Sequence, residues 1–352
     1  MTHTMTLLRA ILTIILLSSE HVYHMLHAEP YIPNNDSVVL ETLPTSRDPQ
    51  IKKLRLLRSQ LSETPDHLPL AVRLARAYLQ VGHRIADPRY DGYAQAALTP
   101  WWNIKNPPPD VLIIRATLRQ RGHDFEQALQ DLARVIEIRP KNAQAWLTQA
   151  VIYQVQGNYQ MARRSCMPLL RLTNAVVSTA CIANIASLNG QAEKGYLSLQ
   201  KAVVQDISAT PQETLWALTI LGEMASRIGK EAEAECYFQE ALHLDQHDTY
   251  VLGAYSDLLL DQGRPEKVQS LLEGRVRSDG LLLRLAIAEQ ALDTPTFTQH
   301  VDILKARFAE NRLRGEARHL REEARFALYL LHQPQQALSL AQKNWTIQRE
   351  YW

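Results

Sequence analysis

The chain has 352 residues, of which 46% are hydrophobic and 21% charged, and its 38 Lys and Arg nearly balance its 37 Asp and Glu. This composition excludes a disordered chain, a collagen-like chain and a small disulfide-dense scaffold. A net charge of +1 also argues against a dedicated nucleic-acid binder, which usually carries a basic domain. Glycine is scarce and the helix formers Leu and Ala are abundant, so we expect an all-α protein.

The N-terminal segment combines one basic residue, a short apolar run and a small residue ahead of a polar stretch. Arg9 precedes the apolar run at residues 10–17, and Ala28 ends the segment. This order is typical of a secretory signal peptide. We predict a signal peptide over 1–28, cleaved after Ala28, followed by an extended segment over 29–48. The mature protein would then be periplasmic or secreted.

The apolar run is too short to anchor the chain in a membrane. A bilayer core requires roughly 20 apolar residues in a helix, and no later segment is that long and apolar either, so no stable span is expected in the mature chain. The alternative is a cytoplasmic protein whose N-terminal helix is uncleaved and buried.

Small residues recur along the chain at a nearly constant spacing. Ala116 and Ala150 are 34 positions apart, Ala150 and Ala183 are 33 apart, and Gly222 follows 39 positions after Ala183. The longer spacing predicts about five extra residues near 206–211. The best-matching copy, at residues 143–172, contains Trp146, Ala150, Tyr153, Gly157, Tyr159 and Ala162.

This pattern resembles the tetratricopeptide repeat (TPR), a unit of 34 residues built from two helices, here named A and B. The resemblance, to exported bacterial TPR proteins, implies a right-handed superhelical solenoid of about seven antiparallel helix pairs. Small residues would let helices A and B approach closely, and glycine would end helix A. We expect divergent repeats with a Trp/Pro connector over 49–108, the clear array over 109–275 and degenerate repeats over 276–352.

Two features depart from the repeat pattern. Arg115 and Arg119 stand where apolar or aromatic residues are usual, which predicts that the first clear repeat faces a polar neighbour. Trp101 and Trp102 precede three prolines, which indicates a packed corner at a repeat junction. An exposed aromatic binding patch is the alternative for this pair.

The three cysteines lie at positions 166, 181 and 236. The repeat pattern places Cys166 on a helix B and Cys181 on the following helix A, where neighbouring helices would bring them within disulfide range. We predict this bridge if the chain is exported, with two buried thiols as the alternative. Cys236 would be unpaired, and no spacing suggests a redox or zinc site.

No familiar motif for nucleotide binding, metalloprotease activity or a nucleophilic serine occurs in the sequence. His319 lies near Glu322 and Glu323, but nearby arginines suggest a solvated helix face rather than a metal site. We therefore predict that the protein is not an enzyme and has no catalytic residue, metal or cofactor.

The resemblance implies that the A helices line the concave side of the solenoid. Gln154 and Asn184 would hydrogen-bond an extended peptide, and Trp216 and Tyr250 would anchor its side chains. A merely solvated inner face is the alternative. The candidate partner-binding residues are Gln120, Arg121, Gln144, Leu147, Gln154, Asn184, Trp216, Glu223, Arg227, Tyr250 and Asp257.

The predicted function is that of a non-enzymatic scaffold. It would bind a protein or peptide, and no nucleic acid, in its concave groove, in the assembly or maintenance of a bacterial envelope complex. The alternative is a cytosolic TPR adaptor with an uncleaved N-terminal helix.

Overall fold

The computed structural model describes residue 35 and residues 48–313 and 319–349. The predicted signal peptide over 1–28 lies outside these residues, as does nearly all of the extended segment over 29–48. All the helices described below belong to the unit Arg47–Trp352. In this part of the chain no helix is both long enough and apolar enough to cross a membrane.

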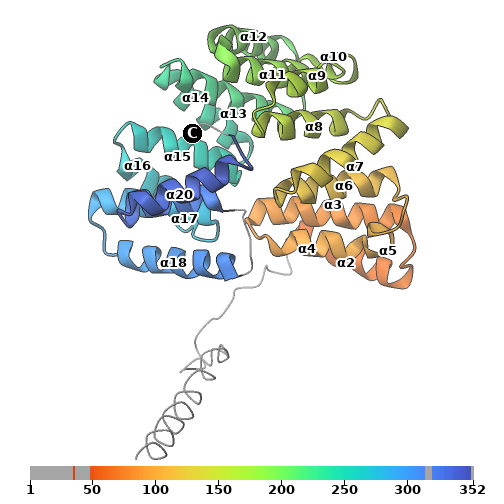
Figure 1. The fold of residues 1–352 in the computed structure, drawn as a ribbon, viewed down its shortest axis with the longest axis horizontal. Helices are drawn as coiled ribbons and strands as arrows, with labels where there is room; N and C mark the ends of the chain where they lie inside the picture. Colours follow the sequence, from red (N-terminus) through yellow and green to blue (C-terminus); the bar gives the residue numbers. More distant parts are fainter. Residues whose placement is uncertain (1–34, 36–47, 314–318, 350–352) are drawn as a thin grey trace, which may run out of the picture. The chain divides into compact units, whose positions relative to one another are not determined.

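The unit is a row of antiparallel helix pairs (Figure 1), which confirms the predicted all-α, right-handed superhelical solenoid. The A helices are α3 (Leu68–Ile85), α6 (Pro109–Arg121), α8 (Ala143–Val155), α11 (Ala175–Ala186), α13 (Pro211–Arg227), α15 (Thr249–Asp261), α17 (Asp279–Leu292) and α19 (Leu320–Arg325), the last continued by η2 (Phe326–Leu330). The B helices are α4 (Arg89–Ala97), α7 (Phe125–Ile138), α9 (Tyr159–Cys166), α12 (Ala192–Gln205), α14 (Glu231–Leu244), α16 (Pro265–Leu272), α18 (Phe297–Leu313) and α20 (Pro334–Trp345).

Four shorter or terminal elements complete the row. Helix α2 (Pro49–Glu63) packs against α3 ahead of the first pair, and α5 (Thr99–Trp102) follows α4. Helix α10 (Leu169–Leu172) follows α9, and η1 (Ser187–Gln191) forms the turn between α11 and α12.

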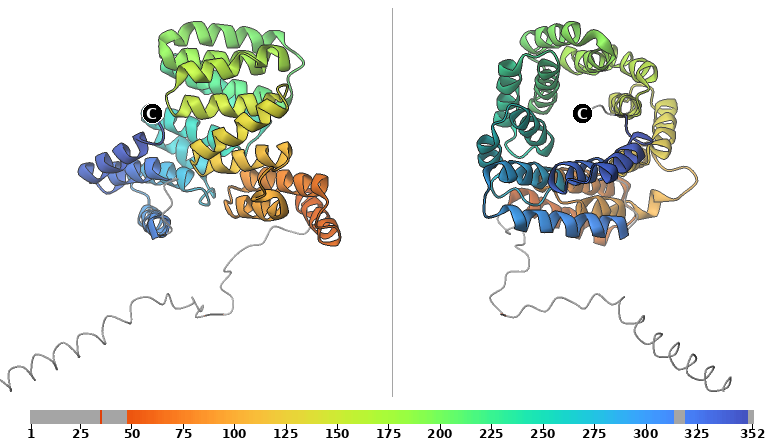
Figure 2. Two further views of the ribbon diagram at one scale, coloured as in Figure 1. Left: turned by 45° about the vertical axis from the view of Figure 1, so that its right-hand side comes forward. Right: turned by 60° about the vertical axis from the view of Figure 1, so that its left-hand side comes forward.

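The A helices form a continuous layer. Each A helix contacts the next A helix along the chain, from α3 to α19. Successive helices that touch along a curved row lie on its tighter side, and Figure 2 shows the pairs following such a curve. We call the surface of this layer the inner face.

Close approach of the two helices in a pair depends on glycine, as the repeat pattern predicts. A Cβ atom added at Gly222 of α13 would lie 2.7 Å from the Phe238 ring of α14. In the first pair, a Cβ at Gly82 would lie 2.6 Å from that of Tyr90. Separations this short do not occur between real side chains, so larger residues would force the paired helices apart.

Helix B of the first pair follows its helix A after a short turn. Helix α4 begins at Arg89, three residues beyond Ala86, the left-handed residue that ends α3. Asp87 is the turn residue, and its carboxylate accepts hydrogen bonds from the backbone and side chain of Arg89. Gly82 supplies the space into which Tyr90 packs, so the helix can begin directly after the turn.

The extra residues expected near 206–211 form the loop between α12 and α13. The Asp206 carboxylate in this loop accepts hydrogen bonds from the backbone nitrogens of Ala175, at 2.7 Å, and Val176, at 3.3 Å, which begin α11. Hydrogen bonds from Ser208 and from these two amides hold the pKa of Asp206 below its usual value. The loop therefore caps α11, the A helix of the pair that it follows, at its N-terminus, where an anion is favourable.

Candidate partner-binding face

The predicted groove residues lie on five successive A helices, α6, α8, α11, α13 and α15, and they differ in exposure. Gln144 is exposed, and Tyr250 keeps 57% of its surface accessible. Glu223 is buried, at 8% exposure. The others are partly buried: Gln120, Arg121, Leu147, Gln154, Asn184, Trp216, Arg227 and Asp257.

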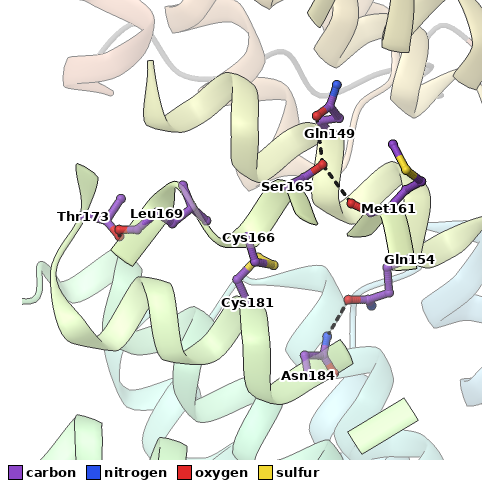
Figure 3. Close-up of a disulfide and its surroundings, with 9 residues drawn as sticks. All are labelled: Gln149, Gln154, Met161, Ser165, Cys166, Leu169, Thr173, Cys181 and Asn184. Atoms are coloured by element: carbon purple, nitrogen blue, oxygen red, sulfur yellow. Dashed lines mark hydrogen bonds between the residues drawn. A yellow bond between two sulfur atoms is a disulfide. The ribbon is translucent and has the colours of Figure 1, made fainter. Parts of the chain in front are cut away.

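Gln154 and Asn184 contact each other across two A helices. Asn184 Nδ2 on α11 donates to Gln154 Oε1 on α8 at 3.3 Å (Figure 3). The Oδ1 atom of Asn184 is buried and accepts no hydrogen bond from the described part of the chain. The two residues expected to bind a peptide backbone therefore contact each other across neighbouring repeats.

A second bridge joins η1, α13 and α15. Arg227 Nη1 donates to Ser187 Oγ at 3.0 Å, and its guanidinium lies 3.4 Å from Glu223. Tyr250 Oη donates to the other oxygen of Glu223 at 2.6 Å. The hydroxyl of Tyr250 is thus fixed while its ring stays exposed, so the ring is presented in a defined orientation.

A third bridge joins α15, α17 and α19. Asp257 accepts from Arg284 Nε at 3.0 Å and from Arg325 Nη2 at 2.7 Å. Arg284 also donates to the backbone carbonyls of Gly253 and Gly280. Sequence reasoning missed Arg284, although a single arginine within the apolar run at 281–287 indicates a buried cation. We call these bridging residues the polar ladder: Gln154, Asn184, Ser187, Glu223, Arg227, Tyr250, Asp257, Arg284 and Arg325.

The Asp257 bridge predicts a loss of stability in acid. Burial alone would raise the pKa of Asp257, but the charges of Arg284 and Arg325 outweigh it and lower the pKa below its ordinary value. A depressed folded-state pKa contributes stability above the unfolded-state value, about 3.9, which is lost as the pH falls through the folded-state value. We expect the melting temperature to fall below about pH 4, and less steeply in Asp257→Asn than in the wild type.

The matched control is Asp302→Asn, because Asp302 forms an exposed ion pair with Lys305 on one helix. This variant should keep the wild-type pH profile in a series of thermal melts. If Asp257→Asn gave the same profile as well, Asp257 would not be a source of acid sensitivity.

The two unusual arginines of the first clear repeat face their own helix B. Arg115 donates to both carboxylate oxygens of Asp131 on α7, at 2.8 and 2.7 Å, and Arg119 pairs with the same carboxylate. The polar neighbour that they predict is therefore within the repeat. Arg115 also lies over the Trp102 ring, and both Trp101 and Trp102 are partly buried against the N-terminal hydrophobic cluster.

Arg121 does not extend into open solvent. Its guanidinium forms an ion pair with Asp91 of α4, so it links the first two helix pairs. Trp216 is also packed, because it contacts two hydrophobic clusters, one that includes residues of α13 itself and one that includes residues of α8, α9 and α11. These contacts leave Gln144 and Tyr250 as the predicted residues with the most accessible side chains.

Cys166 of α9 and Cys181 of α11 form a disulfide, with their Cα atoms 5.8 Å apart (Figure 3). Both residues are buried, and the bond joins a helix B to the following helix A. Cys236 on α14 is free and exposed.

The His319 region contains ion pairs between side chains. Glu322 accepts from Arg321, and Glu323 pairs with Arg312 of α18. Across residues 48–313 and 319–349, no group of three or more His, Cys, Asp or Glu is arranged to hold a metal ion.

The last described residues, 347–349, reach the C-terminal ends of α6 and α8, a contact that the sequence did not predict. The backbone nitrogen of Arg349 donates to the carbonyl of Val155, the last residue of α8, at 2.7 Å. Gln348 contacts His123, just beyond α6, and Ile347 packs against the cluster of α6, α7 and α8.

The paired helices and the continuous A layer define a TPR-type solenoid. The structure is similar to that of the Rap protein complexed with Competence and Sporulation Factor, with a TM-score of 0.52, 14% identity, and coverage of 85% of this chain and 95% of that one. It is also similar to the APC/C hetero-tetramer Cut9-Hcn1, with a TM-score of 0.49, 13% identity, and coverage of 84% of this chain and 52% of that one. The match thus covers about half the length of the Cut9-Hcn1 chain to which it aligns.

The pilus biogenesis factor PilW has a TM-score of 0.43 and 21% identity, over 58% of this chain and 95% of its own. No protein-family model matches the sequence, and a search of curated proteins found no match. Identities this low establish a shared fold and no shared partner.

Proposed function

We propose that the protein is a non-enzymatic scaffold that binds a protein or peptide on its inner face and serves in the assembly or maintenance of a bacterial envelope complex. The observation that carries the proposal is Tyr250, whose exposed ring is held by the hydrogen bond from its hydroxyl to Glu223. Because the ring is already oriented, little side-chain entropy is lost when a partner packs against it.

The polar ladder supports this role by fixing the surface on which a partner would lie. Its hydrogen bonds and ion pairs connect A helices from α8 to α19. Gln144 is exposed near one end of this surface and Tyr250 lies further along it. A protein or peptide that spans several repeats would therefore meet both polar and aromatic contacts.

Two features support an envelope location. The N-terminal sequence has the order of a signal peptide. The disulfide between Cys166 and Cys181 is of a kind that persists in oxidising compartments such as the periplasm.

Intact mass of the protein from its native host, without reductant, tests the location. Export predicts a chain that begins at Glu29 and is lighter by two hydrogen atoms because of the disulfide. A chain beginning at Met1 with three free thiols would favour the cytosolic adaptor and would contradict export.

Replacing Gln144 and Tyr250 together with alanine is expected to lower partner recovery at least tenfold. Truncating one well-placed aromatic anchor commonly costs about 2 kcal/mol or more of binding free energy. Recovery is measured after chemical crosslinking in the native host. The matched control is Leu197→Ala on α12, a B helix, where the leucine is 54% exposed. Equal recovery by both variants would refute binding on the inner face.

A further inference from the structure

The last described residues lie against the C-terminal ends of α6 and α8. Helix α20 ends at Trp345, and the chain then crosses to α6 and α8, which lie more than 190 positions earlier in the sequence. We call residues 347–349 the C-terminal strap.

Each residue of the strap makes a different kind of contact. Ile347 packs against the hydrophobic cluster formed by α6, α7 and α8. Gln348 Nε2 lies 3.3 Å from His123 Nε2. The backbone nitrogen of Arg349 donates to the Val155 carbonyl at 2.7 Å, and its side chain passes over Gly157.

The receiving site is made by the C-terminal ends of two A helices. The last carbonyl groups of a helix have no partner within that helix, so the Val155 carbonyl can accept a hydrogen bond from another segment of chain. The same end carries the negative pole of the helix dipole, which favours a basic side chain such as that of Arg349. A Cβ atom at Gly157 would lie 3.2 Å from Arg349 Cδ, so glycine leaves room for that side chain.

The strap is lightly held. Ile347 and Gln348 are only partly buried, and Arg349 is exposed. Only one backbone hydrogen bond joins the strap to α8 among those of the described residues. Contacts this few can be exchanged for those of a competing chain.

We propose that the C-terminal ends of α6 and α8 form a site for a peptide with an aliphatic residue two positions before a basic one, and that the strap occupies this site in the unbound protein. The inference rests on the proposed function and specifies one partner segment, which gains access by displacing the strap.

The test uses a fluorescent peptide with the sequence of residues 344–352, NWTIQREYW, and the full-length protein in three forms. Ile347→Asp removes the apolar contact of the strap and is expected to free the site. Leu338→Asp is the matched control, because Leu338 is 60% exposed on α20, outside the strap. By fluorescence anisotropy we expect Ile347→Asp to bind the peptide at least tenfold more tightly than the wild type or Leu338→Asp.

A second variant and a second peptide make the result independent of folding defects. Arg349→Pro removes the N–H group that donates to Val155 and should also increase peptide affinity. A peptide with aspartate in place of isoleucine should bind none of the proteins. Equal affinity for all four proteins, no binding by either released variant, or equal binding of the aspartate peptide would overturn the inference.

The probe is the chain's own sequence, so this outcome does not depend on any cellular partner. Two results would support the site and refute the wider proposed function. The Ile347→Asp and Arg349→Pro variants would bind the peptide, and the double variant at Gln144 and Tyr250 would recover its partner as well as the wild type does. If partner recovery depended on Gln144 and Tyr250 but no variant bound the peptide, the wider proposed function would be supported and the peptide site refuted.

Discussion

Replacing Asp131 with asparagine is expected to destabilise the first clear repeat by about 3–5 kcal/mol. The Asp131 and Arg115 side chains are only 4% and 9% exposed, and Arg119 shares the same carboxylate. Removing the anion leaves a buried guanidinium without its counter-charge, which is far more costly than losing a surface ion pair. Urea unfolding followed by circular dichroism measures the loss.

Asp110→Asn is the matched control for this substitution. Asp110 also pairs with two arginines, Arg76 and Arg139, but its side chain is 35% exposed. Exposed pairs contribute about 0–1 kcal/mol, so this variant should unfold close to the wild-type midpoint. If Asp131→Asn and Asp110→Asn lowered the free energy of unfolding by similar amounts, burial would not determine how much the Asp131 ion pairs stabilise the protein.

Removing the disulfide by changing Cys166 and Cys181 to alanine is expected to cost about 3 kcal/mol. The bond spans a sequence separation of 15 residues, and closing a loop of that length restricts the unfolded chain by about this amount. The wild type should lose the same stability when reductant is added, whereas the double variant should be insensitive to it.

Cys236→Ser serves as the control because Cys236 is exposed and free. It should unfold at the wild-type urea concentration, with the same response to reductant. If reductant did not change the urea midpoint of the wild-type protein, a stabilising bond between Cys166 and Cys181 would be contradicted.

The helix pairs follow from local signals in the sequence. The 34-residue spacing of small residues indicates where helices A and B approach, and Gly222 against Phe238 shows the physical reason. The same spacing places Cys166 and Cys181 on neighbouring helices. Such features depend on contacts within one or two repeats, which periodicity alone describes.

The polar ladder is harder to predict because it depends on how successive repeats are rotated. Tyr250 pairs with Glu223, and Arg284 pairs with Asp257, each 27 positions earlier. Gln154 and Asn184 are 30 apart. These spacings are shorter than the 34-residue repeat by one or two helical turns. The repeat period alone does not predict this difference. The repeat pattern therefore indicates which residues lie on the A helices, but it does not indicate which side chains of other repeats they contact.

The contacts of the C-terminal strap cannot be predicted from the local sequence. Gln348 and His123 are 225 positions apart, and they meet only because the curvature of many repeats accumulates. No pattern around residues 346–349 distinguishes this segment from an ordinary helix end.

Photocrosslinking from single positions in the native host determines whether partners bind on the inner face. A photoreactive amino acid is placed at Gln144 on α8, or at Leu197 on α12 as the outer control, since both side chains are exposed. Binding on the inner face predicts a specific crosslinked partner from position 144 and none from position 197. Crosslinks from position 197 alone would contradict it.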